Sequence, residues 1–135
     1  MADDTRRLRV ALKANALFSG LCGLALMIMP GTWSELIGLP LPWILGALGF
    51  GLACFAALAA HAAADVPARR AIIALIIGAD MLWVAATPIA MVTGANTLTA
   101  PGQGLIALVG LIVAALAAAQ WTGLRAVNRG PVAQT

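Results

Sequence analysis

One acidic side chain lies in the middle of a long apolar stretch, and it is the residue whose chemistry most needs an explanation. Asp80 follows Arg70 by ten residues and is the single charged residue between positions 71 and 92. In a helix that begins beside Arg70, a rise of about 1.5 Å per residue places Asp80 about 15 Å along, near the centre of a hydrocarbon layer about 30 Å thick. A charged aspartate there costs roughly 2.5–3.5 kcal/mol on insertion scales, so such residues usually face the interior of a helix bundle or a wet cavity.

Uncharged polar side chains in other apolar stretches are the natural partners of Asp80, because no Lys or Arg lies at a comparable depth. Asn15 lies about 9 Å beyond the first basic cluster and Gln120 about 7.5 Å before the last one, so both fall in the same half of the membrane. Trp83, one turn from Asp80, has an indole N–H that needs an acceptor. We therefore expect an intramembrane polar cluster, the candidate functional site, made of Asp80, Asn15, Ser19, Gln120 and Trp83.

Two roles fit such a cluster. Hydrogen bonds between polar side chains can hold membrane helices in register, in which case Asp80 is a structural clamp. Alternatively, an ionisable residue inside a membrane marks a functional site, such as a proton-coupled gate or a pocket for a polar headgroup or a quinone. The sequence leaves both roles open. The substitution Asp80→Asn separates them, because asparagine keeps the hydrogen bonding and loses the ionisable group.

The chain offers little for a metal, a cofactor or a catalytic group. His61 is its one histidine, Cys22 and Cys54 both lie within apolar stretches without a CxxC spacing, and no nucleophile is accompanied by an evident base. A metal site needs several such ligands close together, and a covalent mechanism needs a nucleophile beside its base. We therefore expect no metal, no cofactor and no catalytic residue.

Four apolar segments must position these residues. Hydrophobic residues make up 62% of the 135-residue chain and charged residues 10%, whereas a soluble domain carries about 25% charged residues. The charges flank apolar runs that are long enough to cross a membrane as helices, for which roughly 18 residues suffice. We expect an all-α membrane protein in which residues 1–135 form a single domain, a bundle of four transmembrane helices at about 9–29, 42–63, 71–92 and 104–124.

Basic residues predict the orientation of this bundle. All eight Lys and Arg lie in the N-terminal region, in the segment 64–70 or in the C-terminal region, and four spans place these three regions on one side of the membrane. Short segments rich in Lys and Arg stay in the cytoplasm, so we expect both termini to be cytoplasmic and the charge split to oppose dual topology. Tryptophan favours the membrane boundary, and we expect interface anchors at Trp33 and Trp43 outside and at Trp121 inside.

Two further segments are expected to lie outside the membrane core. Residues 1–8 are predicted to form a polar cytoplasmic tail. The segment 32–41 is mostly apolar, with Glu35 as its one charge. It is predicted to lie on the outer surface as a short interfacial or re-entrant turn.

A weak internal repeat relates the second predicted helix to the fourth. Gly51 begins an alanine-rich stretch that ends at His61, and Gly110 begins a similar stretch that ends at Gln120. Such a repeat would relate two parallel helical hairpins about an axis along the membrane normal. Alanine-rich composition alone would also produce this match, so the repeat stays one of two explanations.

The layout of the chain also resembles that of a known group of proteins. The first helix contains the run Leu17-Phe18-Ser19-Gly20, residues 35–40 read Glu-Leu-Ile-Gly-Leu-Pro, and the third helix contains an acidic residue near its middle. These features resemble small, uncharacterised four-helix inner-membrane proteins of bacteria. The resemblance implies a multi-pass protein of the bacterial inner (cytoplasmic) membrane and implies no particular activity.

The leading functional hypothesis is a non-enzymatic helical module that acts as a homo-oligomer or as an accessory subunit of a membrane complex. Small residues on the fourth helix, including Gly110, Ala114 and Ala118, allow another helix to approach closely. The alternative is a small transporter or channel. In that case Asp80 either couples transport to protons or cations or binds the substrate.

The expected partners are membrane lipids and either a second copy or another membrane protein. No nucleic acid is expected, because the basic residues flank membrane segments and form no separate basic domain.

Overall fold

The computed structural model describes residues 2–129 and consists of helices, with no strand in that range. The helices, in chain order, are α1 (Ala2–Ile28), α2 (Pro30–Ile37), α3 (Pro42–Ala64), α4 (Arg70–Thr93) and α5 (Ala100–Asn128). Four of them, α1, α3, α4 and α5, are long and apolar enough to cross a membrane. The expected all-α architecture with four long apolar helices is therefore confirmed, and it is compatible with a multi-pass membrane protein.

The first and last long helices extend beyond their expected ends. Helix α1 begins at Ala2, so residues 2–8, which were expected to be a polar tail, are helical. Asp3 and Asp4 lie in its first turn, where negative charge interacts favourably with the helix dipole. Leu8 is fully buried. Helix α5 begins one residue after Thr99, whose hydroxyl accepts a hydrogen bond from the Gly102 N–H at 3.0 Å and so caps the helix.

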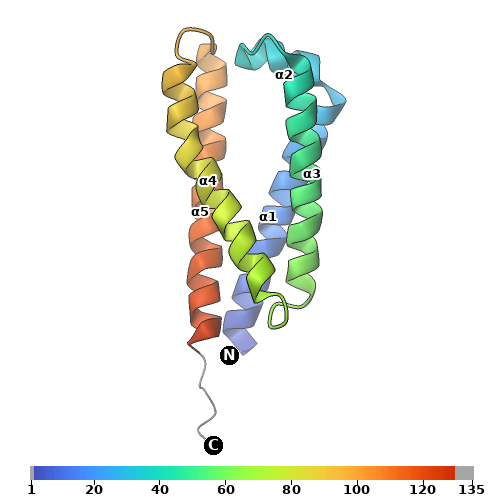
Figure 1. The fold of residues 1–135 in the computed structure, drawn as a ribbon, viewed down its shortest axis with the longest axis vertical. Helices are drawn as coiled ribbons and strands as arrows, with labels where there is room; N and C mark the ends of the chain where they lie inside the picture. The colour runs from blue at the N-terminus through green and yellow to red at the C-terminus, as the bar shows by residue number, and fades with distance from the viewer. Residues whose placement is uncertain (1, 130–135) are drawn as a thin grey trace, which may run out of the picture.

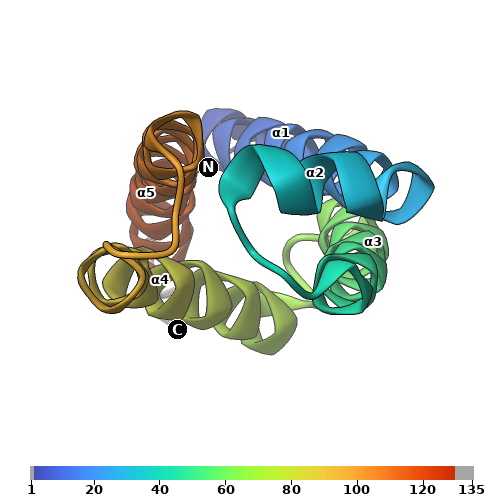
Figure 2. The ribbon, with the colours of Figure 1, turned by 90° about the horizontal axis from the view of Figure 1, so that it is seen from above.

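The segment 32–41, predicted as a surface turn, instead contributes most of a short helix. Helix α2 begins at Pro30, a residue suited to a first helical turn. It ends at Gly38, which has φ 88° and donates its N–H to the Ser34 carbonyl at 2.9 Å. The left-handed conformation turns the chain out of the helix, and glycine adopts it without steric cost. Gly38 therefore ends α2. Figure 2 shows α2 lying across one end of the bundle, over the space that the long helices surround.

The long helices form two closely packed pairs, α1 with α3 and α4 with α5 (Figure 1). Gly23 and Gly49 bring the first pair together: a Cβ atom on Gly23 would lie 2.7 Å from the Gly49 carbonyl oxygen. In the second pair a Cβ atom on Gly110 would lie 2.8 Å from the Thr87 methyl group. Glycine at these contacts lets the helix backbones approach, which is how helices associate where the surroundings are as apolar as the side chains.

The two pairs meet at the end of the bundle that carries the start of α1 and the end of α5, which we call the terminal end. An apolar core fills this end, and its largest fully buried members are Leu8, Leu12, Ile73, Ile76 and Ile77. Toward the opposite end, which we call the α2 end, the two pairs lie apart and α2 connects them (Figure 1). The bundle is therefore closed by side chains at one end and by a helix at the other.

Candidate functional site

Four of the five residues of the predicted polar cluster are joined by hydrogen bonds. Oδ2 of Asp80 accepts a hydrogen bond from Asn15 Nδ2 at 2.6 Å and another from Gln120 Nε2 at 3.1 Å. The Ser19 hydroxyl donates to Asn15 Oδ1 at 3.1 Å. All four side chains are at most 5% exposed. Asp80 thus connects α4 to α1 and to α5 across the inside of the bundle.

One buried acceptor of the cluster has no donor among the described residues. Gln120 Oε1 is buried and receives no hydrogen bond from any residue that the structure describes. Both donors to Asp80 are uncharged amides, so the carboxyl group is stabilised by hydrogen bonds alone. Hydrogen bonds of this kind between polar side chains hold membrane helices in register.

On the side of the terminal end, apolar residues enclose the cluster. The turn next to each cluster residue carries a buried apolar side chain: Leu12 on α1, Ile77 on α4 and Leu124 on α5. These side chains belong to the apolar core of the terminal end. The polar cluster is therefore sealed from that end of the bundle.

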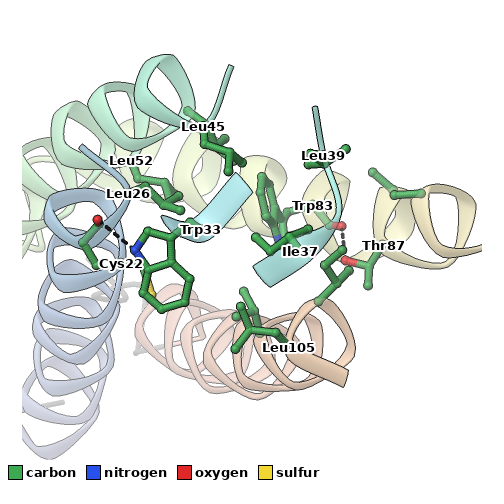
Figure 3. A pocket seen from close by; sticks show the side chains of 16 residues that line it. Cys22, Leu26, Trp33, Ile37, Leu39, Leu45, Leu52, Trp83, Thr87 and Leu105 are labelled. Carbon is green, nitrogen blue, oxygen red and sulfur yellow. Dashed lines mark hydrogen bonds between the residues drawn. The ribbon is translucent and has the colours of Figure 1, made fainter. Parts of the chain in front are cut away.

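Trp83, the fifth residue of the predicted cluster, is not hydrogen-bonded to it. The Trp83 indole lies one turn from Asp80 toward the α2 end and forms part of the wall of a cavity (Figure 3). Its N–H donates to no residue between positions 2 and 129, and the Trp83 carbonyl accepts a hydrogen bond from the Thr87 hydroxyl at 2.9 Å. Trp83 is therefore part of a second feature, which the sequence did not predict.

This second feature is an apolar cavity of about 410 Å³ between the two helix pairs. It begins one turn beyond the polar cluster, where Cys22 on α1 and Trp83 on α4 line it, and it is partly open to its surroundings. Figure 3 shows side chains from all five helices directed around it. The lining residues are Cys22, Ala25, Leu26, Trp33, Ile37, Leu39, Leu45, Leu48, Leu52, Trp83, Ala86, Thr87, Ala90, Leu105, Ile106 and Val109.

Helix α2 covers the cavity and is attached to both helix pairs. On one side the Trp33 indole N–H donates to the Ala25 carbonyl of α1 at 2.9 Å. On the other side the Thr99 N–H donates to the Ile37 carbonyl at 3.0 Å, and the Thr99 hydroxyl donates to the Leu36 carbonyl. Gly102 lies so close to Ile37 that a Cβ atom on it would clash with the Ile37 backbone. Hydrogen bonds thus hold α2 over the cavity from two directions.

The predicted interface anchors lie in three different settings. Trp33 is half-buried and lines the cavity, so it is part of the cover that α2 forms. Trp43, in the first turn of α3, is 69% exposed, and Trp121, near the end of α5, is 43% exposed. The guanidinium group of Arg125 lies over the Trp121 ring at 4.5 Å, a cation–π arrangement.

The other candidate ligands of the sequence lie apart from each other. Cys22 lines the cavity and Cys54 is exposed, and both thiols are free. His61 is exposed, and its carbonyl accepts a hydrogen bond from Arg69. No group of three or more His, Cys, Asp or Glu side chains that could hold a metal ion occurs among residues 2–129.

No protein-family model, curated protein or solved structure matches this chain. What the chain does is therefore inferred from its own cavity and its own polar cluster. The two features are adjacent: Asp80 and Trp83 lie on successive turns of α4, as do Ser19 and Cys22 on α1. Sequence reasoning found the first feature through its unusual residue types and missed the second, whose walls are made of ordinary apolar residues.

Proposed function

We propose that this chain is a non-enzymatic membrane module that holds an apolar, lipid-soluble molecule between its two helix pairs. The observation that carries the proposal is the cavity of about 410 Å³ beneath α2. Small-molecule sites in proteins are concave, mostly apolar and about 300–1,000 Å³ in volume. An unfilled apolar space of this size would deprive its walls of dispersion contacts, which an apolar occupant restores.

The chemistry of the cavity walls selects an apolar occupant. None of the described residues that line it carries a charge. The Trp33 N–H and the Thr87 hydroxyl are already used in hydrogen bonds to the protein backbone. A charged or strongly polar molecule would lose its hydration here without gaining partners. Lipid-soluble molecules are abundant in a bilayer, so the bilayer is the source that we propose.

The proposed setting is the inner membrane of a bacterium, with both termini in the cytoplasm. Support comes from the eight Lys and Arg residues, which all lie in the three regions that the fold brings to the terminal end. In this orientation the α2 end faces outward. The pairing of α1 with α3 and of α4 with α5 is also the arrangement that two repeated hairpins would have, and the repeat itself stays a prediction.

In this proposal the polar cluster acts as a clamp that sets the spacing of the helix pairs at the base of the cavity. Its support is that Asp80 receives hydrogen bonds from two other helices while the apolar core encloses it on the terminal side. The module acts as a homo-oligomer or as an accessory subunit that presents its occupant to another membrane protein.

A second candidate, a small transporter or channel coupled to Asp80, has one observation in its favour. Asp80 lies a single turn from Trp83 on the cavity wall, so a substrate in the cavity would lie near the carboxyl group. The substitution Asp80→Asn distinguishes the two candidates in proteoliposomes. Loss of a pH-dependent flux with assembly intact supports the transporter, whereas a flux unaffected by the substitution rules out that role for Asp80.

Nuclear magnetic resonance of the four tryptophan indole N–H groups tests the binding proposal. Undecane added to the protein in lipid nanodiscs should shift the resonances of Trp33 and Trp83 saturably and leave those of Trp43 and Trp121 unchanged, because only the first two line the cavity. Ala86→Leu, which fills part of the cavity, should weaken this binding several-fold. Ala79→Leu on the exposed face of α4 is the matched control. Equal, unsaturable shifts of all four resonances, or none, would contradict the proposal.

A further inference from the structure

We infer that the occupant of the cavity is a neutral apolar molecule carrying a carbonyl group, such as a long-chain ketone, an ester or a quinone, and that this carbonyl accepts a hydrogen bond from the Trp83 indole N–H. The inference rests on the proposed function and adds to it the chemical class of the occupant. It also makes Trp83 the residue that distinguishes a carbonyl compound from a plain hydrocarbon.

The first step is a comparison of the hydrogen-bond donors on the cavity wall. Trp33 donates its indole N–H to the Ala25 carbonyl, and Thr87 donates its hydroxyl to the Trp83 carbonyl. Trp83 donates its own N–H to no residue in the described part of the chain, as the hydrogen bonds of residues 2–129 show. The remaining donor, the Cys22 thiol, is a weak one.

The second step is the position of the Trp83 indole. Its side chain lies among those that surround the cavity, whereas the Trp33 nitrogen is directed toward α1 and hydrogen-bonded there (Figure 3). A membrane interior provides no water to satisfy an indole N–H, and an unpaired donor there is costly. Trp83 is half-buried, and a tryptophan enclosed by protein usually finds an acceptor for this group. The occupant of the cavity is the partner best placed to supply one.

The third step is the charge of that acceptor. A carboxylate or phosphate would also accept from Trp83, but it would need a cation, and none of the lining residues is basic. A carbonyl oxygen accepts a hydrogen bond and remains neutral. The walls around it, which include Leu26, Leu52 and Leu105, then enclose the hydrocarbon part of the molecule.

A matched pair of probes tests the inference: undecane and methyl nonyl ketone, which have the same number of carbon atoms and differ by one carbonyl oxygen. Binding to the protein in nanodiscs is followed through the indole N–H resonances. The ketone should bind about three- to tenfold more tightly than undecane, the advantage expected of one neutral hydrogen bond. Both probes should shift the Trp83 resonance, but only the ketone should move its N–H proton downfield, as a hydrogen bond does; this readout requires no variant.

Two variants complete the test. Trp83→Phe keeps the ring and removes the N–H, so it should abolish the preference for the ketone while undecane still binds; an unchanged Trp33 resonance shows that the cavity remains folded. Cys22→Ala should keep the preference. A preference that survives in Trp83→Phe, or that disappears in Cys22→Ala, overturns the inference while leaving the proposed function standing. If neither probe shifts Trp33 or Trp83, the proposed function itself fails, and the inference with it.

Discussion

At the scale of single residues, Asp80 is the side chain whose surroundings are best defined. Asn15 and Gln120 donate hydrogen bonds to the same carboxyl oxygen from two different helices, and Gln120 Oε1 is left unpaired among the described residues. A replacement at position 80 therefore has to provide an acceptor at that point.

Asp80→Asn is expected to leave the free energy of unfolding within about 0.5 kcal/mol of its original value, because the asparagine oxygen can accept the same two hydrogen bonds from Asn15 and Gln120. Asp80→Leu is the matched control, since it removes the acceptor of the Asn15 and Gln120 side-chain amides. That variant should lose about 1–3 kcal/mol. Thermal unfolding in detergent micelles measures both changes. Equal destabilisation by Asn and Leu would contradict the role of Asp80 as a hydrogen-bonding clamp.

The four-residue part of the cluster was predictable because polar residues are rare in apolar helices and their depth follows from helical rise. Counting from the basic clusters placed Asn15, Asp80 and Gln120 close enough to meet. The prediction that Trp83 belongs to the polar cluster was wrong. Its spacing in the sequence puts Trp83 one turn from Asp80 but does not give the direction of the indole ring. The structure places that ring on the cavity wall, a distinction that needs the packing of all five helices.

At the scale of elements, two glycines explain why α1 and α3 pack closely. A Cβ atom on Gly49 would lie 2.6 Å from the Gly23 carbonyl oxygen. Backbone atoms move less readily than side chains, so any larger residue here separates the helices. Gly46, one turn earlier on α3, has nothing within 4 Å of such a Cβ atom.

Gly49→Ala is therefore expected to destabilise the protein by about 1–3 kcal/mol, as overpacking does. Gly46→Ala should be neutral or stabilise the protein by up to about 1 kcal/mol, because alanine is the better helix former. Thermal unfolding of the two variants in the same detergent gives the comparison. A Gly49→Ala variant as stable as Gly46→Ala would mean that the close contact between α1 and α3 does not limit their packing.

The cover formed by α2 depends on the left-handed conformation of Gly38. A Cβ atom at this position would lie 2.4 Å from the Thr97 carbonyl oxygen, in addition to the unfavourable φ of 88°. Gly38→Ala should therefore loosen the contact between α2 and the segment before α5, at a cost of about 1–2 kcal/mol from the backbone conformation alone.

Hydrogen exchange of the backbone amides checks this expectation: exchange in residues 36–39 should rise about tenfold in Gly38→Ala. Gly31→Ala, at the start of the same helix and in open space, is the control and should leave exchange unchanged. Equal exchange in both variants would show that Gly38 does not hold α2 in place. Pro30 and Gly38 are residue types that begin and end a helix, but the short apolar segment 32–41 between the long helices led to the prediction of a surface turn.

At the scale of the whole molecule, the sequence predicted the number and type of the long helices because apolar length is sufficient for that purpose. It did not predict the cavity, and the reason is physical. In a membrane the lipid is as apolar as a protein core, so Leu26, Leu52 and Leu105 on the cavity wall have the same character as leucines that face lipid. Hydrophobic patterning distinguishes inside from outside in a soluble bundle and loses that ability here.

Orientation in the membrane is a prediction that belongs to the whole chain. Reporter fusions should place both termini and the segment between α3 and α4 in the cytoplasm. A phosphatase that is active only outside should therefore be active when fused after Asn96, in the segment between α4 and α5, and inactive after Arg69. A fluorescent protein that matures only in the cytoplasm should give the reverse. Mixed signals at both sites would indicate dual topology and contradict the eight-to-zero distribution of basic residues.

The attachment of α2 to both helix pairs has a consequence for the size of the occupant. The cavity ends at the polar cluster on one side and at α2 on the other, and moving either boundary would break hydrogen bonds. These two boundaries therefore limit its length along the helices, whereas the walls between them consist of side chains, which can repack. The protein should therefore select its occupant by length. It should accept molecules of different thickness and exclude those that are too long to fit between the polar cluster and α2.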